Sequence, residues 1–152
     1  MSTVLAQQFR EGLKAIETAL LDLSPQVAET PWREGGWTRK EIVGHMLDSA
    51  ANNRHRFVRA ATQESYAGPD YAQESWVAMH GYATQPWATL LLWWRVEHQI
   101  LMAVVEQIPE ERLGVSCTVG EKEPVTLEFL IEDYLRHQHW HLTQLQAPVA
   151  AT

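Results

Sequence analysis

Hydrophobic residues recur at steps of three and four positions in four separate segments, a spacing typical of the buried face of an α-helix. The segments are residues 4–23, 38–61, 86–109 and 126–146, so the pattern predicts four long amphipathic helices. The positions predicted to face the interior are Leu5, Phe9, Leu13, Ile16, Leu20 and Leu23; Ile42, Met46, Ser49, Asn53 and Phe57; Leu91, Trp94, His98, Leu101 and Val105; and Leu127, Leu130, Tyr134, His137, His141 and Leu145.

The segments between these helices carry turn signals. Thr38 and Glu41 have the spacing of a capping box, which marks the start of the second helix, and Pro86 suits the first turn of the third. The crossover between these two helices is the longest, and Trp76 and Met79 suit a short helix within it. Residues 115–124 favour a small hairpin or an extended loop rather than a sheet. We therefore predict an all-α four-helix bundle, with residues 1–152 forming one domain.

Composition and charge narrow the class of partner. The chain has 152 residues, of which 45% are hydrophobic, and this is enough for one buried core. A net charge of −7 with twelve Lys and Arg residues argues against nucleic acid, so we expect a small-molecule partner. No apolar run is long enough for a bilayer and no signal-peptide pattern is present, so we expect a cytoplasmic protein without membrane contact. Cys117 is the only cysteine, and a metal site within one chain must therefore use His and carboxylates.

Three histidines are candidates for metal ligands. His137 and His141 are four residues apart, so their rings lie on the same face of one helix. His45 lies on another helix, on the face of Ile42 and Met46 that should point inward. Such rings suit a divalent metal, although hydrogen-bonded core histidines are the alternative at each position. Gln138 follows His137 where the zinc-protease motif has Glu, and that motif is absent.

Other polar residues near these histidines are candidates for catalysis or for orienting the rings. Asp48, one turn beyond His45, is a candidate catalytic base or ring-orienting group. His98 interrupts the apolar stripe of the third helix and is a second catalytic candidate, more as a pocket residue than as a ligand. Gln144, Glu132 and Asp133 could accept hydrogen bonds from the His137 and His141 rings, although Glu132 and Asp133 fit a solvated helix face better.

The remaining polar and aromatic positions fit simpler roles. His139 points about 200° away from His137 around the helix and should face solvent. His55, between two arginines at 54 and 56, fits a solvated basic face. Trp93 and Trp94 are adjacent and cannot both face one core, so one of them should line a pocket or a partner surface.

Two motifs in this chain resemble the DinB/YfiT-like superfamily. The first runs from Trp37-Thr38 through Glu41-Ile-Val-Gly-His-Met-Leu-Asp-Ser49, and the second is His137-Gln-His-Trp-His-Leu-Thr-Gln-Leu145. The resemblance spans nearly the whole chain and implies a four-helix bundle, often dimeric, that binds zinc or nickel. It assigns the ligand positions to His45, His137 and His141.

The resemblance also implies a range of activities. Characterised relatives include bacillithiol and mycothiol S-transferases and a thiol-dependent maleylpyruvate isomerase, while others are named as metal-dependent hydrolases. Three protein ligands leave a coordination position open, as in catalytic sites. The leading hypothesis is a metal-dependent enzyme that activates a low-molecular-weight thiol for S-transfer. A metal-dependent hydrolase and a non-enzymatic small-molecule or stress-response binding protein remain the alternatives.

Overall fold

The computed structural model describes residues 3–150, and its four long helices match the four predicted segments to within two residues at each end. Pro86 immediately precedes its helix rather than occupying the first turn. The elements in chain order are α1 (Val4–Leu21), α2 (Pro25–Ala28), α3 (Arg39–Thr62), β1 (Tyr66–Gly68), α4 (Gln73–His80), the 3₁₀ turn η1 (Tyr82–Thr84), α5 (Trp87–Gln107), the 3₁₀ turn η2 (Glu110–Arg112), β2 (Ser116–Val119), β3 (Val125–Thr126) and α6 (Leu127–Leu145).

Side-chain caps fix the starts of the two helices that carry the histidines. At α3, the Thr38 hydroxyl accepts from the Glu41 amide at 3.2 Å, and the Glu41 carboxylate accepts from the Thr38 amide at 3.1 Å. This is the predicted capping box, and it satisfies two amides that the helix itself leaves unpaired. At α6, the Thr126 hydroxyl accepts from the Phe129 amide at 3.1 Å. Both helices therefore begin at positions set by local sequence.

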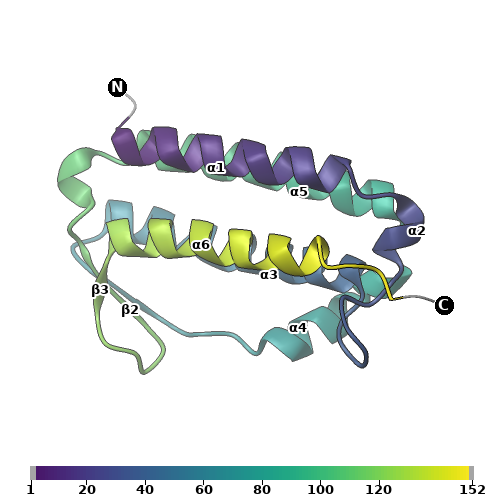
Figure 1. Ribbon diagram of the computed structural model, residues 1–152. Helices are drawn as coiled ribbons and strands as arrows, with labels where there is room; N and C mark the ends of the chain where they lie inside the picture. The colour runs from purple at the N-terminus through teal and green to yellow at the C-terminus, as the bar shows by residue number, and fades with distance from the viewer. Residues whose placement is uncertain (1–2, 151–152) are drawn as a thin grey trace.

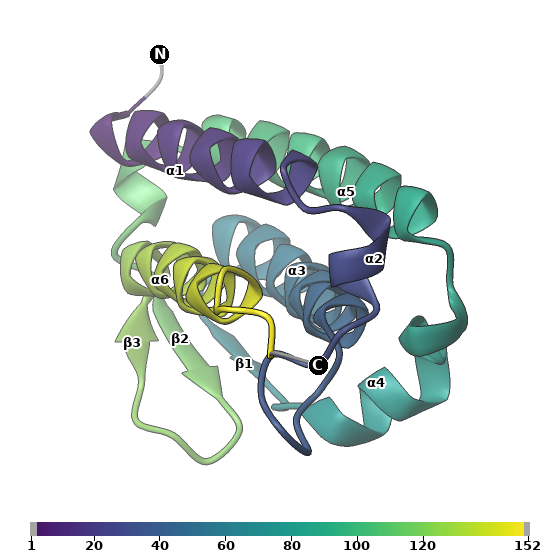
Figure 2. The same ribbon diagram turned by 45° about the vertical axis from the view of Figure 1, so that its right-hand side comes forward.

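The four long helices form a bundle of two layers, as predicted (Figure 1). One layer holds α1 and α5 and the other holds α3 and α6, and each helix also contacts a helix of the other layer. In the turned view the hairpin and α4 lie beside the α3–α6 layer, away from α1 (Figure 2). The apolar stripes meet in one core that runs between the layers. Trp94 is buried in it while Trp93 is exposed, as predicted for an adjacent pair.

The structure contains a small three-stranded sheet, whereas the sequence favoured a hairpin or an extended loop without a sheet. Strands β2 and β3 pair antiparallel, and β1 adds to β2 in parallel, with Tyr66 opposite Cys117. Strand β1 has three residues and no alternating pattern, so its sequence carries no local strand signal. Its pairing depends on contacts between residues about fifty positions apart. The sheet thereby joins the crossover after α3 to the connection before α6.

A buried arginine fixes the end of α6 that follows the histidine pair. The Arg39 side chain is fully buried and donates to the carbonyls of Leu145 and Ala147 at 2.9 and 2.6 Å. It also donates to the Thr30 hydroxyl at 2.7 Å and to the Pro31 carbonyl at 2.9 Å. One side chain therefore joins the carboxyl end of α6 to the loop before α3.

The crossover packs closely on α3 at Gly44. A Cβ atom at this position would overlap the ring of Tyr82, so the missing side chain lets η1 approach the helix. Tyr82 is buried there, and its hydroxyl reaches Asp48 one turn further along α3. Within residues 3–150, no helix combines the length and the hydropathy needed to cross a bilayer.

Candidate metal centre

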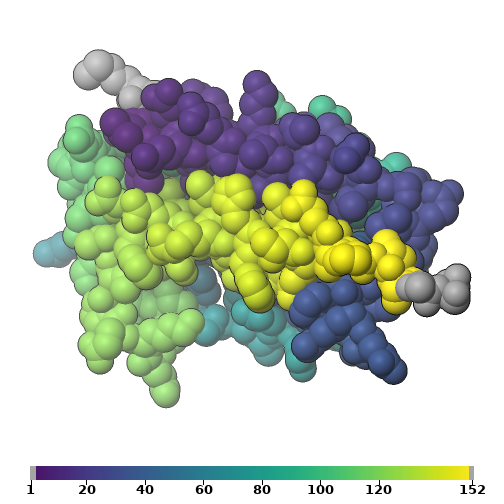
Figure 3. Space-filling view, viewed as in Figure 1, coloured from purple at the N-terminus to yellow at the C-terminus, as the bar shows by residue number. Residues whose placement is uncertain are grey.

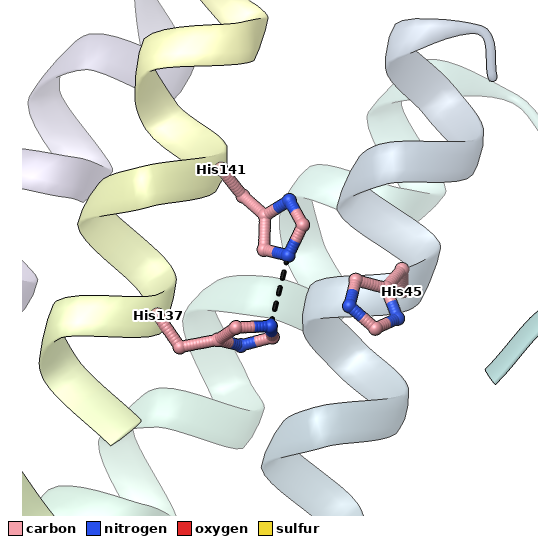
Figure 4. Close-up of side chains that lie close together, drawn as sticks. All are labelled: His45, His137 and His141. Atoms are coloured by element: carbon pink, nitrogen blue, oxygen red, sulfur yellow. Dashed lines mark hydrogen bonds between the residues drawn. The ribbon is translucent and has the colours of Figure 1, made fainter. Parts of the chain in front are cut away.

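The rings of His45, His137 and His141 converge between α3 and α6, as the sequence predicted, and we call them the histidine cluster (Figure 4). One nitrogen from each ring lies within 4.8 Å of the others. The Nε2 atoms of His137 and His141 are 3.0 Å apart. The ring centre of His45 is 5.2 Å from that of His137 and 4.6 Å from that of His141. Residues 92 positions apart in the sequence thus share one point in the bundle.

Burial keeps these rings in their neutral form. Burial, together with the neighbouring His141 and His137, lowers the pKa of His45 to about 3. The pKa of His141 falls to about 4, chiefly through burial and despite its hydrogen bond to the Gln144 amide oxygen, which favours the charged form. Burial also lowers the pKa of His137, while nearby Asp133 opposes the change. Neutral imidazoles are the form in which histidine binds a metal.

Two neighbours orient the rings. The Nδ1 of His141 lies 2.6 Å from the Gln144 Oε1, and donation to this amide oxygen leaves the Nε2 lone pair directed at the cluster. This is one of the acceptors that the sequence suggested. The Trp37 ring packs on His45 with its centre 5.2 Å away. The Trp37 side chain is half-buried and covers one side of the cluster.

The donor set fits a divalent metal better than it fits a group of core histidines. A hydrogen bond between His137 and His141 satisfies that pair but leaves His45 without a hydrogen bond among residues 3–150, and its Nδ1 is buried. Zinc–nitrogen bonds of about 2.0–2.1 Å place two nitrogens of a tetrahedral site about 3.3 Å apart, close to the 3.0 Å found here. Imidazole nitrogens suit zinc, copper, iron and nickel. A metal would use all three rings.

A cavity of about 210 Å³ opens beside His137. Helix α3 contributes Ser49, Asn53 and Arg56 to its wall, and the segment after β1 contributes Tyr71. The hairpin and the first half of α6 complete it. In the space-filling view the hairpin forms a lobe that projects beyond α6 (Figure 3). The cluster is therefore next to a space that a small molecule can enter.

Asp48 is buried near the cluster but makes its contacts elsewhere. Its Oδ1 accepts from the Tyr82 hydroxyl at 2.6 Å and lies 3.2 Å from the His80 Nδ1. Burial raises the pKa of this carboxyl, and the Tyr82 hydrogen bond and His80 partly offset that effect. Its Oδ2 is buried without a partner among the described residues. The structure therefore joins Asp48 to the crossover, and no hydrogen bond links it to His45.

His98 is buried in the core with both ring nitrogens occupied. Its Nδ1 is 2.8 Å from the Trp94 carbonyl and its Nε2 is 2.5 Å from the Tyr134 hydroxyl. The Trp94 ring stacks on it with centres 3.9 Å apart. Burial lowers the pKa of His98 to about 4. It lines a groove of about 490 Å³ between α1 and α5, and none of the cluster histidines lines that groove.

Two predictions for the outer positions need correction. His139 points away from the cluster as predicted, but it is half-buried in a groove between α1 and α6 rather than fully solvated. His55 is exposed, whereas its neighbour Arg56 is buried and lines the cavity. Arg54 is half-buried and pairs with Glu97 at 2.9 Å. The basic face predicted around His55 does not exist as one surface, because the helix turns each residue to a different side.

Sequence reasoning missed most of the cavity wall. Tyr71 and Lys122 come from connections whose position depends on the pairing of β1 with β2. Their sequences carry turn residues but no motif, so nothing local could identify them. Arg56 carried one usable signal, because it falls on the same helical face as Ser49 and Asn53, which were predicted to point inward.

Comparison with known sequences gives one family and several relatives. The family model of the DinB superfamily matches residues 8–145. YfiT of Bacillus subtilis, named as a metal-dependent hydrolase, is 27% identical over 140 residues, which cover 91% of this chain and 79% of YfiT. A Bacillus mycoides protein with the same kind of name is 32% identical over 73 residues, less than half of either chain.

Comparison with solved structures finds the same fold. The structure of Bacillus subtilis YfiT, described as an unusual four-helix bundle topology, superposes with a TM-score of 0.83 and 23% identity, covering 96% of this chain and 86% of that one. The mycothiol-dependent maleylpyruvate isomerase superposes with a TM-score of 0.78 and 17% identity, covering 96% of this chain and 61% of that one. The bundle is thus shared with proteins named for two different reactions.

Proposed function

The chain belongs to the DinB superfamily, and from this membership and the histidine cluster we propose a metal-dependent enzyme that activates a low-molecular-weight thiol for transfer to an electrophile. The observation that carries the proposal is the convergence of three neutral histidines beside a cavity. His45, His137 and His141 would hold zinc or nickel. A bound divalent ion would supply a Lewis acid that stabilises the thiolate form of the substrate near neutral pH.

The side chains around the cluster prepare it for this chemistry. Gln144 keeps the proton of His141 on Nδ1, so that Nε2 remains a ligand. Trp37 shields His45 from water on one side. All three ligands are neutral, so a bound cation would keep its full charge for the substrate. The open cavity beside His137 supplies the route by which a small molecule reaches the cluster.

To form the reactive anion near neutral pH, such a site has to lower the pKa of a thiol by less than that of water. A thiol starts from a pKa near 8.5, whereas water starts near 15.7. Hydrolysis remains the second candidate because YfiT, which matches 91% of this chain, is named as a hydrolase. A hydrolase would also need a base near the reacting water. Asp133, which lines the cavity with His137, is better placed for that role than the buried Asp48.

We assign positioning roles to Asp48 and His98. Asp48 binds Tyr82 and His80 and thereby holds the crossover against α3. His98 joins α5 to α6 through Tyr134, which lies one turn before His137. Both nitrogens of His98 are hydrogen-bonded to groups of the protein, and His98 does not line the cavity beside His137, so it has no direct contact with a molecule there.

The test compares metal-loaded and chelated protein with a low-molecular-weight thiol and monochlorobimane as the electrophile. We expect faster thiol consumption with the metal, and we expect His45→Ala to remove the difference. Hydrolysis of activated esters without any response to thiol would favour the hydrolase. If neither activity is found while the metal is in place, the protein is a small-molecule or stress-response binding protein.

We further propose that this single-domain protein is a cytoplasmic homodimer that acts on small molecules without membrane or nucleic-acid partners. Leu92, Val96 and Ile100 follow one another at steps of four on the outer face of α5 and are 61, 50 and 52% exposed. Trp93, exposed beside them, extends this apolar surface. A second copy of the chain would cover it, with each α5 packed against its equivalent. Light scattering on a sizing column tests the assembly.

A further inference from the structure

Arg56 places a buried positive charge in the wall of the cavity beside His137. Only 8% of this residue is exposed, although arginine is rarely buried unless an anion accompanies it. It lies eleven residues after His45 on α3, about 16 Å along the helix axis. The cavity is lined by Arg56 and by His137. A molecule in it can therefore lie against both the guanidinium and His137, the member of the cluster that lines the cavity.

The protein compensates this charge only in part. A guanidinium has five N–H donors. One Nη2 donor reaches the Pro69 carbonyl at 3.3 Å, and the nearest carboxylate oxygen, Oδ1 of Asp70, is 3.8 Å away. Charge-assisted hydrogen bonds are normally about 2.7–2.9 Å long. Among residues 3–150 the guanidinium makes no other hydrogen bond, so most of its donors are available to a ligand.

The nearest carboxylate is already engaged. Oδ1 of Asp70 accepts from the Tyr71 amide at 2.9 Å, and its Oδ2 lies 3.4 Å from the Lys122 ammonium. Two cations therefore share one carboxylate at this end of the cavity. Glu123 and Asp133 also line the cavity, so its wall as a whole carries no excess of positive charge. The feature that favours an anionic group is local, namely the guanidinium donors of Arg56 that lack a partner, and a monoanion suits them. A dianionic phosphate would be less suited, because the Asp70 carboxylate would repel its second charge.

The geometry points to Arg56 as the residue that binds a carboxylate on the small molecule in this cavity, with the reactive group of that molecule at the His137 end. The inference rests on the proposed function, since it concerns the substrate of that same site. The planar guanidinium fork matches the two oxygens of a carboxylate. Ser49 and the Tyr71 hydroxyl supply further polar groups along the wall between the two ends.

A purely structural role for Arg56 would have a different signature. Through the Pro69 carbonyl and Asp70, Arg56 also tethers the crossover to α3. Loss of a tether would loosen the cavity and weaken every ligand equally. Loss of a carboxylate anchor would weaken only ligands that carry a carboxylate. Matched ligands with and without this group therefore separate the two roles.

The experiment uses pairs of ω-mercapto acids and ω-mercapto alcohols of three, six and eight carbons, titrated into the cobalt-substituted protein. The sulfur-to-cobalt charge-transfer band reports binding of the thiol, and chain length measures the span from sulfur to carboxylate. We expect at least one length at which the acid binds tenfold or more tightly than its alcohol. Arg56→Gln should reduce that preference below twofold and leave the alcohol unchanged, and Arg56→Lys should retain part of it. Arg54→Gln, on the same helix and paired with Glu97, is the matched control and should keep the full preference.

Equal binding of acid and alcohol at every length, or an equal loss of both in Arg56→Gln, would overturn the inference. Absence of the charge-transfer band with all of the thiols would instead contradict the proposed thiol chemistry. In that case calorimetry of the metal-free protein with the same pairs still decides the question. An acid preference that depends on Arg56 supports the anchor, and no preference there refutes it.

Discussion

The hydrogen bond from His141 to Gln144 gives the sharpest test of the metal centre. Removing the acceptor with Gln144→Ala leaves the 2.6 Å contact of the His141 Nδ1 unmade, so the ring can rotate or take the other tautomer. Loss of such a partner typically costs 10–100-fold in metal affinity. This corresponds to about 1.4–2.7 kcal/mol. The affinity is measured by competition with a chromophoric zinc chelator at pH 7.5.

Two further variants make this prediction specific. Gln144→Glu supplies a carboxylate acceptor, whose hydrogen bond to the ring is stronger, so metal affinity should be equal to or above that of the native chain. Gln146→Ala changes an exposed residue just beyond the last turn of α6 and should leave the affinity unchanged. The reasoning fails if Gln144→Ala binds zinc within threefold of the native protein, or if Gln146→Ala loses as much.

Four other outcomes follow from the structure. His137→Ala should abolish stoichiometric metal binding by elemental analysis, while His139→Ala, whose ring points toward α1, should retain about one ion per chain. Burial lowers the pKa of His98 to about 4, so between pH 6.5 and 4 the unfolded chain takes up a proton that the folded chain refuses. The unfolding free energy of metal-free protein should therefore fall as pH falls, by up to about 1.4 kcal/mol per pH unit for each such histidine, and urea titrations at pH 7, 6 and 5 measure this. Val96→Glu should convert the proposed dimer to a monomer in light scattering, and an unchanged mass would rule out α5 as the interface. Arg39→Met leaves buried carbonyls without donors and should lower the free energy of unfolding, measured with urea, by about 3–5 kcal/mol. A decrease below about 1 kcal/mol would contradict the role of Arg39 in joining α6 to the loop before α3.

The bundle and the cluster could be predicted because their signals are local. The spacing of Leu127, Leu130 and Tyr134 already placed His137 and His141 on the inner face of α6. The capping box marked the start of α3, and the face of Ile42 and Met46 placed His45 on its inner side. Two helices with known inner faces leave little freedom for the rings between them. For the same reason Gln144, one turn from His141, could be named among its hydrogen-bond acceptors.

The cavity could not be predicted, because it is made by tertiary contacts between weakly patterned segments. The pairing of Tyr66 with Cys117 places Tyr71 beside α3. Strand β1 shows no recognisable alternation, and the alternation of β2 does not reveal which segment pairs with it. The role of His98 was equally hidden. A histidine on an apolar stripe looks the same in sequence whether it meets a ligand or, as here, the Tyr134 hydroxyl.

The candidate site is built partly on long helices and partly on the segments that connect them, and this affects how such a protein can evolve. The proposed metal ligands lie on α3 and α6, and the spacing of these helices is fixed by the bundle core and by the hydrogen bonds of Arg39 to the end of α6. Much of the cavity wall, by contrast, stands on the crossover and the hairpin. Connections tolerate substitution and insertion far better than packed helices do. A lineage built on this plan could exchange one substrate for another by substitutions in these connecting segments, while the helices that carry the proposed metal ligands stay unchanged.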